Sequence, residues 1–164
     1  FYVLEENGDN VTLLLGRNLG SMVAWATQSD YIAAGGTESD YDITSLGPIT
    51  AMNAIRERTA GWTKLDASQI TLPSGQQIAT AGGDTAWTSS HYYTGTVLPT
   101  WLNSYTEFTD GAYYGYWTSS PIPSSSNAAY VRYDGTLTSN FTVDNVNSFG
   151  VRPVITVLKS KLSS

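Results

Sequence analysis

The catalytic chemistry open to this chain is narrow, because it contains one histidine and no cysteine. His91 follows Ser89 and Ser90, so a serine nucleophile beside a histidine base is the first arrangement to consider. No Gly-x-Ser-x-Gly turn is present to expose such a serine. The lack of cysteine excludes thiol nucleophiles and thiolate-bound metal centres. We therefore expect no enzymatic activity and interpret His91 as a loop residue on a polar surface.

Oxygen ligands for a metal ion are present. Calcium is bound by several carboxylate and carbonyl oxygens, and two acidic stretches offer them, Glu38–Asp42 and Asp144–Asn147. Neither stretch has the spacing of an EF-hand loop, and acidic loop residues are usually only solvated. We expect no cofactor, and calcium is the metal that the sequence leaves open.

The aromatic residues suggest recognition rather than catalysis. The chain has 11 tyrosines and 5 tryptophans. Tyrosine offers a large flat surface at low entropic cost, and serine and asparagine add adaptable hydrogen bonds, as in antibody loops. Several tyrosines and two asparagines lie in segments that look too polar for a core, and we expect the ligand-binding surface to comprise Tyr92, Tyr93, Tyr105, Tyr113, Tyr114, Tyr130, Tyr133, Asn145 and Asn147.

The alternative for these tyrosines is that they pack on one face of a strand, where tyrosine is common. The adjacent pairs Tyr92-Tyr93 and Tyr113-Tyr114 favour recognition, because neighbouring side chains on a strand point to opposite faces.

Length and charge bound the function classes. A chain of 164 residues is the size of one domain with a substantial core. Its net charge of -6 and scattered basic residues argue against a nucleic-acid partner. The sequence has no apolar run of membrane-spanning length, so we expect no membrane insertion by this domain. We interpret the chain as a piece of a longer surface protein.

Local signals place the first elements. Two β-prone runs, Phe1–Leu4 and Val11–Leu15, flank Asn7-Gly8 and predict a hairpin. Gly47-Pro48 begins a helix that ends near Gly61.

A second, shorter helix follows Pro73. Ser74 caps this helix and Gln77 completes a capping box.

The remaining segments read as strands and loops. Met22–Trp25 is interpreted as a strand and Thr27–Leu46 as a long surface loop. Further strands are expected at Tyr116–Thr118, Ala129–Tyr133, Leu137–Val143 and Val151–Leu158, with a turn at Asp134-Gly135. This order predicts an α+β fold whose first and last strands pair.

Four motifs resemble the bacterial C-type-lectin-like fold. They are Leu72-Pro73 before a short helix, Gly115-Tyr-Trp-Thr-Ser-Ser-Pro121, Ala129-Tyr-Val131, and Gly150-Val-Arg-Pro-Val-Ile155. The branch in question includes formylglycine-generating-enzyme-like domains and the variable proteins of diversity-generating retroelements. The resemblance implies a small twisted antiparallel sheet, two flanking helices and long irregular loops that hold the binding surface.

Three residues of these motifs are expected to be structural. Arg152 lies in an apolar strand directly before Pro153, where an unpaired charge is costly to bury. It should therefore hold a carboxylate or backbone carbonyls. Trp117 is expected in the core and Pro153 in the scaffold.

The chain departs from the family in its chemistry. It lacks the Glu-Pro-Asn and Trp-Asn-Asp motifs of calcium-dependent sugar binding and the cysteines of the oxygen-dependent enzymes.

These observations predict a non-enzymatic lectin-like or receptor-binding domain, extracellular, at a bacterial cell surface or on a phage particle. Its partner would be a cell-surface protein or glycan, contacted by loops between residues 84 and 148. Two alternatives stay open, a hypervariable protein diversified by a retroelement and the structural head of a pilin-like or adhesin subunit.

Overall fold

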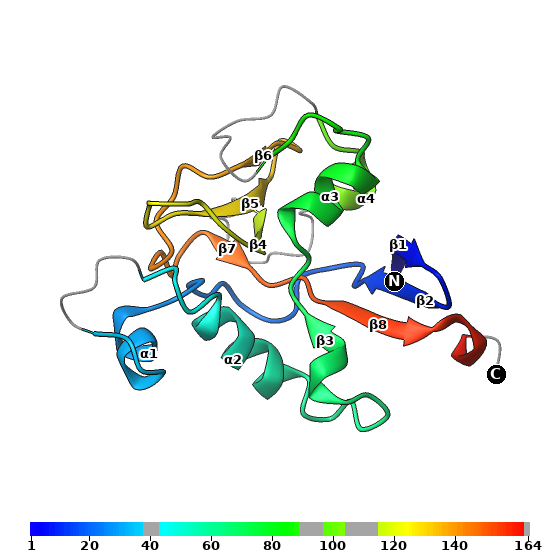
Figure 1. Cartoon of the computed structure of the whole chain (residues 1–164), viewed down its shortest axis with the longest axis horizontal. Helices are drawn as coiled ribbons and strands as arrows, with labels where there is room; N and C mark the ends of the chain where they lie inside the picture. The colour runs from blue at the N-terminus through cyan, green and yellow to red at the C-terminus, as the bar shows by residue number, and fades with distance from the viewer. Residues whose placement is uncertain (38–42, 89–96, 104–114, 163–164) are drawn as a thin grey trace.

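The computed structural model describes residues 1–37, 43–88, 97–103 and 115–162. Its strands form two four-stranded sheets (Figure 1). The first sheet contains, in order, β1 (Tyr2–Asn7), β2 (Asn10–Leu14), β8 (Val154–Leu158) and β3 (Ile70–Thr71). The second contains β6 (Leu137–Thr138), β5 (Ala128–Arg132), β4 (Gly115–Pro121) and β7 (Phe149–Gly150). The fold is α+β, as the sequence predicts.

The first sheet joins the two ends of the described chain. The hairpin β1–β2 turns at Gly8, whose φ of 59° suits glycine, and β2 pairs with β8 over Asn10↔Leu158 to Leu14↔Val154. The prediction that the first and last strands pair is wrong in its partner, because β2, the second strand of the hairpin, lies between β1 and β8 and pairs with both. The second sheet is not purely antiparallel, because β4 and β7 run parallel.

Two helices match their sequence signals. The helix α2 (Ile49–Arg58) follows Pro48 and buries Ala51 and Ile55. The helix α3 (Gly75–Ala81) has Ser74 as its cap, and the capping box with Gln77 is present. A short helical turn, α4 (Thr100–Asn103), and two 3-10 turns, η1 (Ala67–Gln69) and η2 (Lys159–Lys161), are also present.

The expectation of a loop over Thr27–Leu46 is wrong for its first part. The helix α1 (Gln28–Ala33) begins there, capped by the Thr27 side chain, which accepts a hydrogen bond from Asp30 N. One buried side chain, Tyr31, fixes it to the core. A six-residue helix with a single apolar anchor has no periodic pattern to reveal it.

Three strand assignments also need correction. Met22–Trp25 is irregular, although Val23 N and Trp25 N donate to Phe149 O and Val143 O. The expected strand Leu137–Val143 is reduced to β6 and an isolated bridge, Asn127↔Thr142. The last strand begins at Val154, after Pro153, which has no N–H for a ladder.

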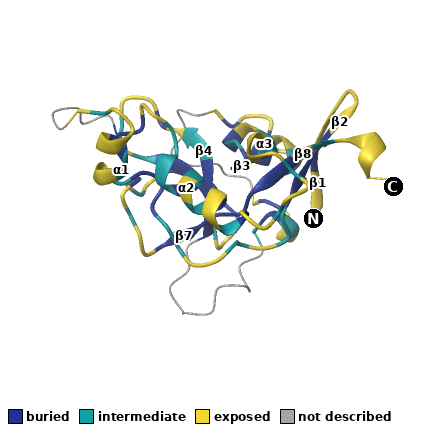
Figure 2. Cartoon of the chain, turned by 90° about the horizontal axis from the view of Figure 1, so that it is seen from below, coloured by how far each residue is buried: buried dark blue, intermediate teal, exposed yellow. Residues whose placement is uncertain are grey.

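The core consists of two hydrophobic clusters that lie on either side of the second sheet. Trp117 and Tyr130 belong to the first cluster, whereas their neighbours Tyr116, Ala129 and Val131 belong to the second. Because successive side chains of a strand point to opposite faces, β4 and β5 are buried on both faces. Figure 2 shows buried residues gathered along the strands, whereas most of β1 and parts of α1 and α2 are exposed.

Candidate functional site

The structure describes only part of the predicted ligand-binding set. Two intervals of that set, 89–96 and 104–114, are outside the described residues. They contain Tyr92, Tyr93, Tyr105, Tyr113 and Tyr114. The members that the structure does describe are Tyr130, Tyr133, Asn145 and Asn147.

The assignment of Tyr130 to a ligand-binding surface is wrong. Its side chain is fully buried, with ring centroids 4.1 Å from Phe149 and 6.0 Å from Trp117. Its hydroxyl bonds the side chain of Asn140, and burial raises its pKa well above the ordinary value. Polar neighbours in the sequence suggested that Tyr130 is exposed, but other segments of the chain cover both faces of β5.

Arg152 and Trp117 have the structural roles expected of them. Arg152 is fully buried and donates from Nε to Leu15 O (2.6 Å), from Nη1 to Leu102 O (3.2 Å) and from Nη2 to Trp101 O (2.7 Å). Trp117 is also fully buried and donates from Nε1 to Val23 O at 2.9 Å. Of the two kinds of partner expected for Arg152, carbonyls are the ones present.

The carbonyl of Leu102 holds together the residues on either side of 104–114. It accepts hydrogen bonds from Arg152 Nη1 at 3.2 Å and from the Tyr116 hydroxyl at 2.5 Å. The Arg152 guanidinium also lies over the Tyr116 ring, 5.3 Å from its centroid. Leu102 and Tyr116 are therefore fixed to each other through buried groups.

The buried Tyr116 hydroxyl makes stability sensitive to alkaline pH. Burial raises its pKa from 10.0 to about 12, opposed in part by the charge of Arg152. Unfolded Tyr116 ionises near pH 10 while the folded residue stays protonated. Its contribution is therefore complete below pH 10 and is lost as the pH rises toward 12.

We expect a loss of about 1.4 kcal/mol per pH unit in that window from this residue. Urea unfolding at successive pH values, compared with Tyr116→Phe, measures the difference in slope. Equal slopes in the two proteins would show that Tyr116 ionises as freely in the folded state as in the unfolded chain.

The turn between β5 and β6 contacts described residues close to three of the four ends of the undescribed intervals. Leu98 N donates to Gly135 O at 2.8 Å, and Gly115 pairs with Arg132. Gly135 has a φ of 85°, and a Cβ there would lie 2.6 Å from Asn103 Nδ2. Residues 98, 103 and 115, which adjoin the two intervals, therefore all contact this turn.

The turn exposes an arginine, a tyrosine and an aspartate. Tyr133 is 40% exposed, and the Arg132 guanidinium lies 5.1 Å from its ring centroid. Asp134 Oδ1 accepts from Thr136 N at 3.1 Å and from Thr136 Oγ1 at 2.7 Å. Its other oxygen is 3.8 Å from Arg132 Nε. We call Arg132, Tyr133 and Asp134 the turn cluster.

The two predicted asparagines are not part of the turn cluster. Asn145 N donates to Thr142 O, and Thr142 bridges Asn127, just before the start of β5. Tyr133 follows the opposite end of the same strand. Asn145 Oδ1 accepts from Asn147 N at 3.0 Å, which indicates a local turn. The structure therefore separates the asparagines from Tyr133 by the length of β5.

The acidic stretches offer no assembled metal site in the described chain. The Asp144 carboxylate accepts from Thr142 Oγ1 at 2.7 Å. Among the described residues, no group of three or more His, Cys, Asp or Glu is positioned to hold a metal ion. Glu38, Asp40 and Asp42 are outside the described residues.

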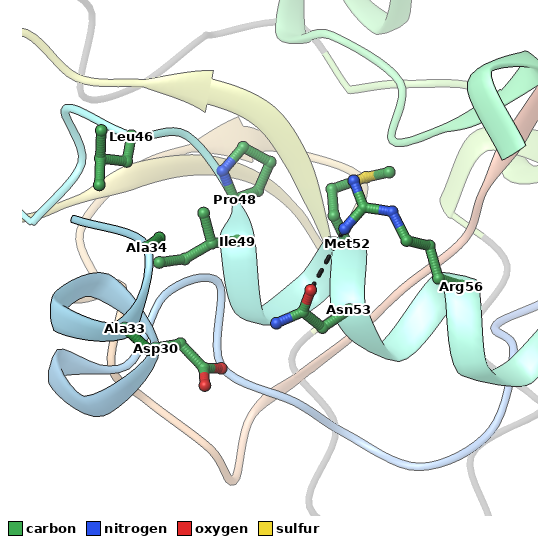
Figure 3. Close-up of a pocket in the computed structure, with 9 residues that line it drawn as sticks. All are labelled: Asp30, Ala33, Ala34, Leu46, Pro48, Ile49, Met52, Asn53 and Arg56. Atoms are coloured by element: carbon green, nitrogen blue, oxygen red, sulfur yellow. Dashed lines mark hydrogen bonds between the residues drawn. The ribbon is translucent and has the colours of Figure 1, made fainter.

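A pocket that the sequence did not suggest lies between α1 and α2 (Figure 3). Its volume is about 370 Å³, and its polar lining residues are Asp30, Asn53 and Arg56. Asp30 Oδ2 accepts from Thr50 Oγ1 at 2.7 Å, and Arg56 Nη1 donates to Asn53 Oδ1 at 3.2 Å. Leu46, Pro48, Ile49 and Met52 supply much of its apolar lining.

The sequence feature that could have indicated this pocket is the spacing of its lining residues along α2. Ile49, Met52, Asn53 and Arg56 recur at helical spacing beside the face that buries Ala51 and Ile55. Ile49 and Met52 also pack against the first hydrophobic cluster, so these side chains both line the pocket and cover the core. Figure 1 shows α1 and α2 well apart from β6 and α4, so the pocket is separate from the turn cluster.

Comparison with known proteins identifies no relative for the chain. No protein-family model, curated protein or solved structure matches it. Within the described residues, no helix has the length and apolar character needed to cross a membrane.

Proposed function

We propose that this chain is a non-enzymatic recognition domain, lectin-like or receptor-binding, from a bacterial or phage surface protein. Its ligand surface comprises the turn cluster and the tyrosine-bearing intervals that adjoin it. Its fold is proposed to be C-type-lectin-like. The hairpin paired with the last strand, the two helices and the buried Arg152 of the closing motif support that assignment.

The main observation in support of the proposal is that residues close to three ends of the undescribed intervals contact the turn after β5. Leu98 is bonded to Gly135, Asn103 lies against Gly135, and Gly115 is paired with Arg132. Trp87, Leu98, Leu102 and Tyr116, which flank the two intervals, also belong to one buried cluster. Many proteins present binding residues on loops that a rigid scaffold positions.

A glycan and protein array, probed with and without EDTA, tests the function. We expect the chain to retain specific ligands, and Tyr133→Ala to weaken their binding about tenfold, because an exposed aromatic contact contributes about 1.4 kcal/mol or more. The matched control is Phe1→Ala, which removes an exposed aromatic side chain that contacts Trp62. Retention that persists in EDTA would show that calcium is not required. An array without any bound ligand would refute the recognition function.

A further inference from the structure

We propose that the outer edge of β1 binds an extended peptide, which adds a strand to the first sheet and places a lysine or arginine side chain in a pocket between β1 and α3. This edge belongs to the first sheet, whereas the turn cluster belongs to the second. Peptide binding at β1 is therefore independent of a ligand at the turn cluster. All residues that form the edge and the pocket are among those that the structure describes.

The backbone direction of β1 follows from its neighbours in the sheet. The strand is the outermost in the order β1-β2-β8-β3. Leu15 N donates to Pro153 O at 2.9 Å, on the side of β8, so Leu13, two positions earlier, also faces β8. Val3 is the β1 partner of Leu13 and therefore directs its N–H and C=O away from β2. The same alternation turns the backbone groups of Glu6 outward.

These outward groups are free in the described chain. No described residue outside the hairpin forms a hydrogen bond with the backbone of Val3 or Glu6. The side chains at the start of the strand are also open, since Tyr2 is 43% and Val3 is 54% exposed. A free strand edge of this kind is a template for pairing with another extended chain.

A pocket of about 390 Å³ lies along this edge. Two of its lining residues belong to β1 and four lie in α3 or directly before it: Leu4, Glu5, Ser74, Gln76, Gln77 and Thr80. Among the described residues, β2 contributes none to the lining, so the pocket opens beside β1 (Figure 1). On an added strand, the side chain opposite Glu5 lies on the same face as Glu5 and therefore meets this pocket.

Glu5 determines the charge of the pocket. It is the only charged residue in the lining that the structure describes. Glu5 Oε2 accepts from Gln77 Nε2 at 2.8 Å, and its second oxygen has no hydrogen bond or ion pair within the described residues. Glu6, by contrast, is paired with Lys159 Nζ at 2.6 Å. Because a carboxylate with an unused oxygen pairs strongly with a cation, the favoured peptide carries a basic residue opposite Glu5.

A basic peptide fits this edge better than a second copy of the chain. Pairing of β1 with β1 of another molecule would bring Glu5 and Glu6 of both copies into one short strand pair, and like charges across strands are destabilising. The net charge of -6 adds to that repulsion. The same charges attract a basic peptide.

The test begins with a phage-displayed library of random eight-residue peptides, selected on the immobilised chain. We expect the enriched peptides to contain lysine or arginine and to be rich in valine, isoleucine or threonine, because β-branched residues favour a strand. Binding of the best synthetic peptide is then measured by fluorescence anisotropy. Replacing its basic residue with glutamate should weaken binding at least about tenfold.

Backbone pairing is tested on the peptide itself. An added strand directs the N–H of every second residue to β1. N-methylation at that alternate set of positions should therefore weaken binding about fivefold or more, whereas N-methylation at the other set should have little effect.

Two substitutions in the protein locate the site. Glu5→Gln removes the charge and keeps the size, so it should weaken binding of the basic peptide at least about threefold. The matched control is Glu57→Gln, at an exposed glutamate of α2, which should bind as the wild type does. Val3→Pro removes an outward N–H and should weaken binding about tenfold, while a proline on an edge strand leaves the β1–β2 bonds in place.

Three results would overturn peptide binding at β1. They are a library without enriched peptides, equal binding by Glu5→Gln and Glu57→Gln, and equal weakening by N-methylation at both sets of positions. None of them refutes recognition at the turn cluster, and an array without ligands leaves peptide binding at β1 intact. If Val3→Pro fails to fold, the N-methylated peptides and Glu5→Gln still decide the outcome.

Discussion

Replacing Arg152 with methionine is expected to lower the free energy of unfolding by about 3–5 kcal/mol, because buried polar groups would lose their partner. The guanidinium is fully buried and bonds the carbonyls of Leu15, Trp101 and Leu102. Without it, the Leu15 and Trp101 carbonyls lose these hydrogen bonds, and the Leu102 carbonyl keeps the bond from the Tyr116 hydroxyl. Methionine fills much of the volume, so the loss measures hydrogen bonding more than packing.

Urea unfolding followed by tryptophan fluorescence measures this change. Arg152→Lys should recover less than half of the loss, since one ammonium cannot reach three separated carbonyls as a planar fork does. Arg56→Met is the matched control, because Arg56 is exposed and makes one side-chain bond, to Asn53. A loss below about 1 kcal/mol for Arg152→Met would contradict the structural role given to this residue.

The second large effect is expected for Gly115→Ala, with a loss of about 3 kcal/mol or more. Gly115 has a φ of 135°, and a Cβ there would lie 1.6 Å from the carbonyl oxygen of Val131. That oxygen is part of the strand backbone and cannot move aside as a flexible side chain could. Relief requires β4 to separate from β5 at Arg132, where the turn cluster begins.

Gly61→Ala is the control for this substitution. Nothing lies within 4 Å of a Cβ at Gly61, and its φ is outside the positive region. It should be neutral or slightly stabilising, by up to about 1 kcal/mol. Equal unfolding midpoints for Gly115→Ala and the wild type would mean that β4 begins with a different backbone from the one described.

The case of Tyr130 shows where sequence reasoning about a site fails. Neighbouring tyrosines and polar residues suggested exposure, since one face of a strand usually meets solvent. In this protein the second sheet has a hydrophobic cluster on each face, so Tyr116, Trp117 and Tyr130 are all buried. Whether the second face of a strand is covered depends on helices and segments far away in the chain, which a local pattern does not report.

Short-range chemistry was readable from the residues alone. The hairpin at Gly8, the capping box of Ser74 and Gln77, and the start of α2 after Pro48 each depend on contacts within a few positions. The sequence also determined that a buried Arg152 needs oxygen partners, because the cost of an unpaired charge does not depend on the fold.

Only the tertiary structure decided which groups meet. Arg152 bonds Leu15, which is 137 positions away, and Trp25 N bonds Val143 O although neither residue belongs to a named strand. The same is true of the turn after β5, where Leu98 and Asn103 contact Gly135, and Gly115 pairs with Arg132. These contacts form because covering both faces of the second sheet removes apolar surface from water. Local sequence preferences do not specify which distant segments provide that cover.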